Sequence, residues 1–144
     1  MEQINIYSGK EVISRVLIDN EVETLASVLD PYKKVYAVMD RSVAMDCPMS
    51  LAIAEILNSK GAPGMLLDAS EQEKTLETVM KICSWLLEQG ADRDALVLAV
   101  GGGITTDLVG FAASIYKRGV RFAYVPTTLL AQVDAAIGGK TGVN

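Results

Sequence analysis

A buried strand, a glycine turn and the start of a helix follow one another directly in residues 95–116. The sequence ALVLAV at 95–100 is continuously apolar, as in a strand covered on both faces of a parallel sheet. Three glycines, 101–103, follow it, and apolar side chains then recur with helical spacing from Leu108 to Tyr116. Glycine lets the backbone approach an anion, and the first N–H groups of a helix are free to bind one. A tight turn alone needs one glycine, so three favour a phosphate-binding turn.

The two commonest nucleotide-binding motifs do not fit this sequence. A G-x-G-x-x-G motif that starts at Gly101 needs glycine at position 106, where the chain has Thr106. A Walker A motif that ends at Lys140 needs glycine at position 134, where the chain has Asp134. A phosphate-binding turn is therefore expected here without either standard motif.

Extended and helical patterns alternate along the chain. The expected strands are 4–7, 12–18, 35–39, 64–67, 95–100 and 121–125. This order predicts one α/β domain over residues 1–144, Rossmann-like, with a mainly parallel sheet flanked by helices. Right-handed crossovers bring the carboxyl ends of parallel strands to one edge, where ligands bind in such folds. Asp40, Asp68, the glycine turn and Thr127 should meet at that edge.

Capping patterns and apolar spacing predict the helices. Asn20 with Glu23, and Ser70 with Glu73, have the spacing of capping boxes, and the second box should start a helix that runs to Gln89. A further helix begins near Pro48, and a short apolar one follows Thr127. The spacing predicts that these side chains face the core: Leu51, Ala54, Ile56, Leu57, Leu76, Val79, Met80, Cys83 and Leu87.

Composition excludes several classes of function. The net charge is −5, so binding to nucleic acid or to an anionic membrane is not expected. The chain shows neither a signal peptide nor an apolar run long enough to span a membrane. Two isolated cysteines, Cys47 and Cys83, fit a reducing, cytoplasmic compartment without a disulfide. The absence of histidine removes the commonest metal ligand and general base.

Two aspartates lie where a nucleotide would bind. Asp40 ends a strand, so it either binds a ribose hydroxyl or caps the next segment, and position alone does not decide. Asp107 lies in the first turn of the helix after the glycines, where it either stabilises the helix dipole or meets a ribose or an amide. Both alternatives stay open for each residue.

Other polar residues have simpler explanations. Glu71 and Lys74 have the spacing of a surface ion pair, and the residues alone favour that interpretation. Thr127 and Thr128 either cap a helix or bind a nucleotide, and Thr105 and Thr106 have the same two options.

The last fifteen residues look functional. Asp134 lies in an apolar helix and needs a partner, which we expect to be Lys140, and a functional role is favoured for this carboxylate. Lys140 stands in a glycine-rich loop, either solvated or bound to a substrate anion. Because only four residues follow Lys140 in this motif-rich loop, we expect the chain to be a fragment of a longer protein.

Four motifs in the second half closely resemble the 3-dehydroquinate synthase family: GGGITTD at 101–107, YKRG at 116–119, VPTTLLAQVD at 125–134 and IGGKTG at 137–142. Upstream, VMD at 38–40 and EQEK at 71–74 are similar to the family's cofactor-binding segments. The resemblance covers the whole chain, weakly before residue 70 and strongly after residue 95.

The resemblance implies an NAD-dependent lyase of the shikimate pathway, which makes aromatic amino acids. The family converts a seven-carbon sugar-acid phosphate, 3-deoxy-D-arabino-heptulosonate 7-phosphate, to 3-dehydroquinate and phosphate. It implies a homodimer and a divalent metal, zinc or cobalt. The metal is held by a glutamate and two histidines in a C-terminal helical domain that this chain lacks. The expectation is therefore an N-terminal NAD-binding domain that ligates no metal and is inactive alone.

By position, the resemblance assigns roles to individual residues. Asp134, Lys140 and Arg118 are the implied catalytic residues, with Arg118 reaching the substrate phosphate of a neighbouring subunit. The implied cofactor-binding residues are Asp40, Ser42, Glu71, Lys74, Gly102, Gly103, Asp107, Thr127, Thr128, Leu130, Asp134 and Lys140.

The chain also departs from the family pattern. Thr106 replaces a common glycine, and Ala135 replaces a common serine, which puts one hydroxyl contact to NAD in doubt. The alternatives are a related sugar-phosphate cyclase, a metal-dependent alcohol dehydrogenase of the glycerol dehydrogenase type and a stand-alone nucleotide-binding regulatory module.

Overall fold

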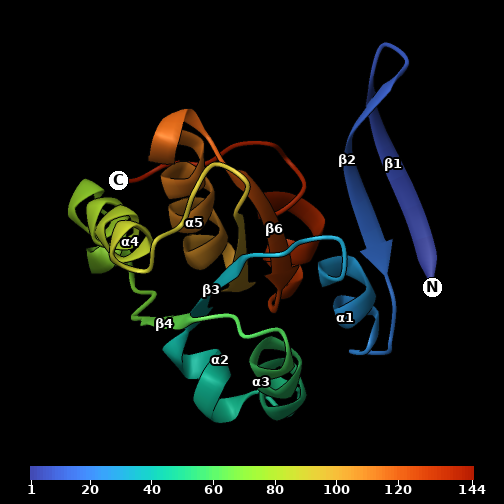
Figure 1. The fold of residues 1–144 in the computed structure, drawn as a ribbon, viewed down its shortest axis with the longest axis horizontal. Coiled ribbons are helices and arrows are strands. Elements are labelled where there is room, and N and C mark those ends of the chain that lie inside the picture. The colour runs from blue at the N-terminus through green and yellow to red at the C-terminus, as the bar shows by residue number, and fades with distance from the viewer.

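The computed structural model, which describes all of residues 1–144, has a parallel sheet between two layers of helices (Figure 1). The sheet has the order β4-β3-β5-β6. Its strands are β3 (Val35–Asp40), β4 (Gly64–Leu67), β5 (Leu96–Gly101) and β6 (Arg121–Pro126). The predicted α/β class and parallel sheet are thus confirmed, with all three strand pairs parallel.

Alternate residues of the central strands face the two helix layers. Val97 and Ala99 of β5 pack with α4 (Leu76–Glu88) and α5 (Gly103–Ile115). Leu96, Leu98 and Val100 face the opposite side, toward α1 (Thr24–Leu29), α2 (Arg41–Asp46) and α3 (Ser50–Ser59). Both faces of β5 are covered, which explains its uninterrupted apolar sequence. Each such Leu or Val contributes about 1.5–3 kcal/mol by burial.

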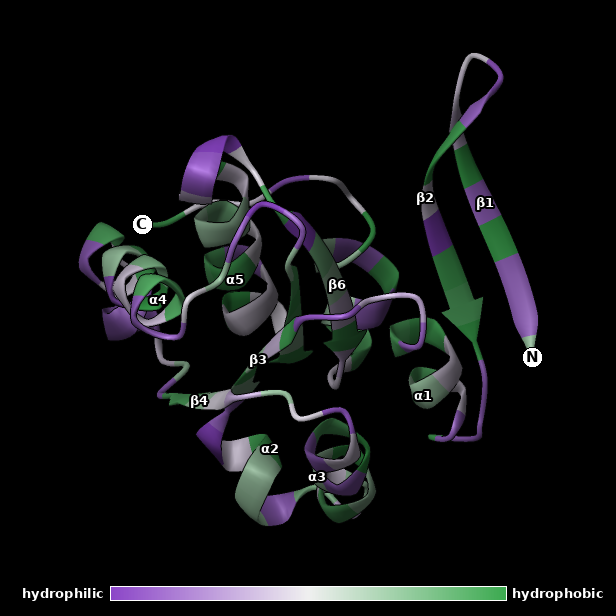
Figure 2. Ribbon diagram, viewed as in Figure 1, coloured by the Kyte–Doolittle hydropathy of each residue, from purple (hydrophilic) through white to green (hydrophobic).

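A separate hairpin precedes this domain. β1 (Glu2–Ser8) and β2 (Glu11–Ile18) pair antiparallel and extend away from the sheet (Figure 1). Hydrophobic and hydrophilic residues alternate along much of β1, whereas β2 ends in a continuous hydrophobic run (Figure 2). The two expected extended segments are therefore confirmed, but they lie outside the main sheet.

Both predicted capping boxes are wrong. Asp19, rather than Asn20, accepts the backbone N–H groups before α1, and that helix begins at Thr24. The segment Glu71–Glu73 forms only a 3₁₀ turn. The long helix starts at Leu76, because the Thr75 side chain accepts the N–H of Thr78 and so caps it. A side-chain cap thus sets the start of α4, whereas α1 starts without one.

The predicted inner faces of two helices need correction. Leu51 is 76% exposed, whereas Leu57 is buried as predicted, together with Ile53, which was not predicted. In α4 the buried apolar residues are Val79, Ile82 and Leu86. The exposed ones, contrary to the prediction, are Leu76, Met80 and Leu87. In addition, α2 was not predicted at all.

The chain after β6 continues as a short helical segment, as expected. Residues Ala131–Ala135 form one π-helical turn beside the start of α5. No helix is both long and apolar enough to cross a membrane. All four strands of the main sheet have their carboxyl ends at one edge. Three segments begin at that edge, namely α2, α5 and residues 127–137.

Candidate functional site

A cleft of about 570 Å³ lies at the carboxyl edge of the sheet. Its walls come from the glycine turn, from the start of α2 and from the segment after β6. The lining residues are Asp40, Ser42, Val43, Asp46, Cys47, Ala69, Gly102, Gly103, Ile104, Thr105, Thr127 and Thr128. This is the edge at which the sequence predicts ligand binding, and six of the predicted cofactor-binding residues meet there.

The three glycines of the turn have three different surroundings. A Cβ at Gly101 would lie 2.6 Å from Thr105 Oγ1, so the helix itself requires this glycine. A Cβ at Gly102 would come 3.1 Å from Thr128 Cγ2, inside the cleft, and one at Gly103 would make ordinary contact with Ala135 at 3.4 Å. Gly102 is the N-cap residue of α5 and has no side chain to bond the free N–H groups. The turn thus leaves an open, positively polarised helix end facing the cleft.

Asp40 caps α2 and also lines the cleft. Its Oδ1 accepts hydrogen bonds from the backbone N–H of Ser42 at 2.9 Å and from the Ser42 hydroxyl at 2.8 Å. The capping alternative is therefore confirmed. Because Asp40 uses only Oδ1 for the cap, Oδ2 has no partner within the chain. Capping and ribose binding are thus compatible in this residue.

The acid–base partners differ from those expected. Lys74 Nζ donates to Asp107 Oδ2 at 2.8 Å, with the two side chains 19% and 21% exposed. Glu71 instead accepts a hydrogen bond from the side chain of Asn144 at 2.7 Å. The predicted Glu71–Lys74 ion pair is wrong, because Lys74 extends across to α5. A partly buried ion pair between two predicted cofactor-binding residues thus flanks the glycine turn.

The four threonines divide into different roles. Thr128 Oγ1 accepts the N–H of Ala131, so its capping role is confirmed. Thr127 donates its backbone N–H to Gly101 O, which ties the segment after β6 to the glycine turn. The Thr106 hydroxyl donates to Gly103 O within α5 and faces no ligand. Thr105 Oγ1 is buried and has no hydrogen-bond partner.

Asp134 and Lys140 do not form the predicted pair. Both residues are exposed, and neither takes part in an ion pair. The π-helical turn directs Asp134 toward solvent, so it needs no internal partner. Leu130, also predicted to bind cofactor, is 67% exposed on the same segment. These three residues lie outside the cleft lining.

Arg118 lies away from the other predicted site residues. It follows α5 at the end opposite the glycine turn, and a 13-residue helix is about 20 Å long. Lys117 and Arg118 both have positive φ, 47° and 67°, which is uncommon for residues other than glycine. The structure therefore does not bring Arg118 to the cleft of its own chain.

Several residues of the site were missed by sequence reasoning. Asp46 and Cys47 line the cleft because α2 follows Asp40 directly. The Asp-x-Ser pattern at 40–42 was the available signal, since an aspartate accepts the N–H two residues later. Tyr124 of β6 was missed as well. Burial, and secondly the charge of Asp107, raise the pKa of Tyr124 to about 12, so its hydroxyl stays protonated beside the Lys74–Asp107 pair.

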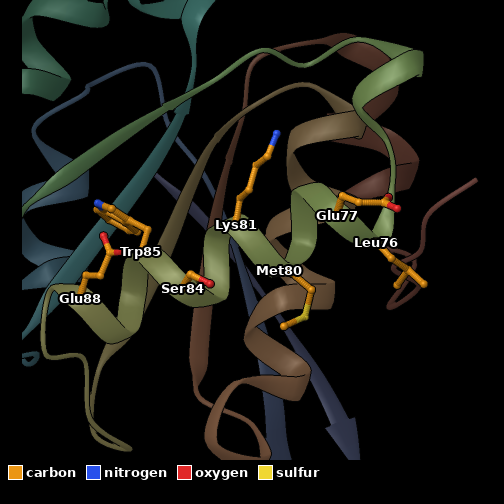
Figure 3. A pocket seen from close by; sticks show the side chains of 7 residues that line it. All are labelled: Leu76, Glu77, Met80, Lys81, Ser84, Trp85 and Glu88. Atoms are coloured by element: carbon orange, nitrogen blue, oxygen red, sulfur yellow. The ribbon is translucent and has the colours of Figure 1, made fainter.

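A second hollow of about 590 Å³ lies along the outer surface of α4 (Figure 3). Leu76, Lys81 and Trp85 are among its lining residues, all of which come from that one helix. No glycine turn and no strand end contributes to it. The cleft at the sheet edge is therefore the candidate site. No group of three or more His, Cys, Asp or Glu side chains is placed to hold a metal ion.

Comparison with known proteins gives a consistent family assignment. A family model described as 3-dehydroquinate synthase N-terminal matches residues 64–144. A 3-dehydroquinate synthase from Paracoccus denitrificans is 42% identical over 135 residues, which cover 92% of this chain and 36% of that protein. One from Blochmanniella floridana is 60% identical over 79 residues, covering 55% of this chain and 22% of its own length. The chain thus spans about a third or less of the length of these relatives.

A solved structure has the same fold. The 2-epi-5-epi-valiolone synthase ValA from Streptomyces hygroscopicus subsp. jinggangensis, solved with NAD⁺ and Zn²⁺ bound, superposes with a TM-score of 0.80 at 34% identity. The match covers 98% of this chain and 40% of that one. The hairpin and the sheet are both included in a match of this extent.

Proposed function

Because the chain belongs to the 3-dehydroquinate synthase family, we propose that it provides the NAD-binding part of a synthase that converts a seven-carbon sugar-acid phosphate to 3-dehydroquinate. The observation that carries this proposal is the open helix end at Gly102 and Gly103, which faces the cleft. A diphosphate there would accept hydrogen bonds from the first N–H groups of α5.

The surroundings of the turn fit the remainder of a dinucleotide. Asp40 Oδ2 is free to accept a ribose hydroxyl at one end of the cleft. At the other side, the Lys74–Asp107 pair is only about one-fifth exposed, and we propose that it meets the nicotinamide half. When bound, NAD would supply a hydride acceptor. The chain's own contribution is to bind and orient it.

We propose that Asp134 and Lys140 reach both the substrate and the nicotinamide of NAD, and that the exposed side chain of Leu130 contacts the nicotinamide half. Both charged side chains are free of internal partners, which leaves them available to a ligand. Arg118 would act on the substrate of a second subunit in a homodimer, which agrees with its distance from the cleft of its own chain.

No metal site can be built from these 144 residues. The chain has no histidine, and no cluster of potential ligands exists. We therefore propose that any zinc or cobalt needed by the reaction is ligated by residues outside this sequence. Residues 1–144 alone should release no phosphate from the substrate, even with NAD and zinc added.

A related cyclase that forms another carbocycle is the alternative function. ValA, which is named for such a product, is 34% identical, whereas the relatives named 3-dehydroquinate synthase reach 42% and 60%. The identities favour 3-dehydroquinate as the product. Both alternatives use the same dinucleotide cleft.

Calorimetric titration with NAD⁺, ADP-ribose and nicotinamide mononucleotide tests the proposed cleft. We expect NAD⁺ to bind most tightly, ADP-ribose less tightly and the mononucleotide most weakly, because Asp40 and the N–H groups of α5 would hold the adenosine and diphosphate parts and the Lys74–Asp107 pair adds contacts to the nicotinamide half. Asp40→Asn keeps a helix cap but loses a charge-assisted hydrogen bond, which should weaken NAD⁺ binding roughly tenfold or more. The matched control is Asp68→Asn, since Asp68 also ends a strand but pairs with Arg41 outside the cleft. Equal losses in the two variants would contradict the assignment.

A further inference from the structure

The residues after Lys140 are fixed to the body of the molecule at three places. We name Thr141–Asn144 the strap. Asn144 donates its backbone N–H to Lys74 O at 3.0 Å, and its side-chain amide to Glu71 Oε2 at 2.7 Å. Val143 packs against the core cluster to which α4 and α5 both contribute. The strap is therefore docked although it forms no helix or strand.

The third anchor is a notch in α5 at Gly110. A Cβ built there would lie 2.1 Å from the Tyr124 hydroxyl oxygen and 2.6 Å from Thr141 Cγ2. Glycine inside a helix costs about 1 kcal/mol relative to alanine, so a buried helical glycine needs a packing reason. Here the reason is that Tyr124 and the strap both occupy the space of the missing side chain.

The strap determines where Lys140 can be. Gly138 and Gly139 precede Lys140, and Gly139 has φ +67°, so the upstream side of the loop is intrinsically flexible. Lys140 makes no hydrogen bond or ion pair of its own. Upstream, the Gly138 N–H still bonds to Asp134 O at 2.8 Å, so Gly139 is the one residue between that hydrogen bond and Lys140, and the downstream anchors hold the other side. One of these anchors is Lys74, whose side chain pairs with Asp107.

We propose that Gly110 and Asn144 are positioning residues: they hold the strap, and the strap places the Lys140 loop beside the Lys74–Asp107 pair. The docking itself is independent of function, whereas its effect on cofactor binding rests on the proposed NAD site. Neither residue touches the cleft lining, so each acts through the loop.

Trypsin cleavage of the Lys140–Thr141 bond measures release of the strap, because native-state proteolysis follows the population of the open form. Lys10, in the turn of the separate β1–β2 hairpin, serves as an internal reference site. Tyr124→Phe removes the hydroxyl and is the starting background. Adding Gly110→Ala then leaves Thr141 Cγ2 as the closest steric conflict. We expect roughly tenfold faster cleavage at Lys140 and no change at Lys10.

A third substitution distinguishes strap release from general damage. Adding Thr141→Ala to the double variant removes the methyl group in conflict, and cleavage at Lys140 should return to within about twofold of the Tyr124→Phe background. A merely unfolded helix would not be rescued in this way. Equal cleavage rates at Lys140 in all three variants would overturn the proposal, as would acceleration at Lys10 to the same extent.

The Asn144 anchor is tested with a matched pair. Asn144→Ala removes the side-chain hydrogen bonds and keeps the backbone bond to Lys74, whereas Asn144→Asp places a carboxylate against Glu71. We expect cleavage at Lys140 to be faster in the aspartate variant than in the alanine variant. The reverse order would contradict the assigned contact.

Saturating NAD⁺ tests the functional half of the proposal. It should slow cleavage at Lys140 in the parent chain, and NAD⁺ affinity should fall in the Gly110→Ala, Tyr124→Phe double variant and recover in the triple variant. Unchanged affinity across the series would overturn the positioning role. If the parent chain binds no NAD⁺ by calorimetry, the proposed function fails, and the cleavage series still decides whether the strap exists.

Discussion

Alanine substitutions at Gly101 and Gly102 should separate stability from binding. At Gly101 the new Cβ would lie 2.6 Å from Thr105 Oγ1 and 2.7 Å from Thr105 Cβ, and Thr105 is fully buried in α5. Overpacking of this kind costs about 1–3 kcal/mol. At Gly102 the nearest atom is the methyl group of Thr128, at 3.1 Å. The backbone there, with φ −81°, suits alanine, and the restricted unfolded chain returns about 0.4–1 kcal/mol.

For NAD⁺ binding we expect the reverse order, with the larger direct effect at Gly102. Gly102→Ala keeps the fold but narrows the approach of a diphosphate to the N–H groups of α5. Loss of one hydrogen bond to a charged group costs about 1.5–3 kcal/mol, which is roughly 10- to 100-fold in Kd. The free energy of unfolding of Gly102→Ala should stay within about 1 kcal/mol of the parent value.

Urea unfolding and calorimetric titration with NAD⁺, at one temperature and ionic strength, measure both quantities. Gly103→Ala is a useful third variant, because its Cβ makes only an ordinary contact with Ala135 and is expected to leave stability unchanged. The reasoning is refuted if Gly102→Ala binds NAD⁺ as tightly as the parent chain, or if it unfolds as easily as Gly101→Ala.

Three further predictions concern groups near the glycine turn. Asp107→Asn leaves the partly buried ammonium of Lys74 without its carboxylate and should lower the free energy of unfolding by about 1–2 kcal/mol. In a double-mutant cycle measured by urea unfolding, Lys74→Met should cost less in the Asp107→Asn background than in the parent chain. The pKa of Tyr124 rises on folding from 10.0 to about 12. Its contribution to the free energy of unfolding is therefore complete below pH 10 and is lost as the pH rises from 10 to about 12. The full pKa shift corresponds to ~2.7 kcal/mol of stability, and the partial exposure of Tyr124 reduces this to about 1 kcal/mol. In urea unfolding at pH 9–12, the Tyr124→Phe variant should therefore lose about 1 kcal/mol less stability than the parent chain as the pH rises. Thr105→Val removes a buried hydroxyl without a partner and keeps the shape of the side chain, so the free energy of unfolding should rise by about 1 kcal/mol, seen as a higher Tm; a lower Tm would contradict this.

The strands were predictable because their signal is local. Each strand of the main sheet was found within one or two residues, since continuous apolar runs end at turn residues such as Asp40 and Gly101. Helix starts depend on which polar side chain captures the free N–H groups. Thr75 caps α4 in place of Ser70, whereas α1 has no side-chain cap, and Asp19 accepts only the N–H groups of Asn20 and Glu21 in the turn before it. Several residues that can cap a helix lie close together before α1 and before α4. Their capping preferences differ too little for the sequence to decide between them.

The edge of the sheet was predictable, but the partners of its charged side chains were not. Sequence reasoning paired charges that are close along the chain, Glu71 with Lys74 and Asp134 with Lys140, and both pairings are wrong. In a parallel sheet the loops that follow different strands gather at one edge, and here α4 and α5 also pack together on one face, although long stretches of sequence separate these segments. Lys74 therefore meets Asp107, 33 residues away, and Glu71 meets Asn144, 73 residues away. Short-range pairing rules apply on the surface of one helix, and none of these four groups shares a helix with its partner. At such an edge, charged residues near strand ends should first be paired across neighbouring loops, and only the remainder along the chain.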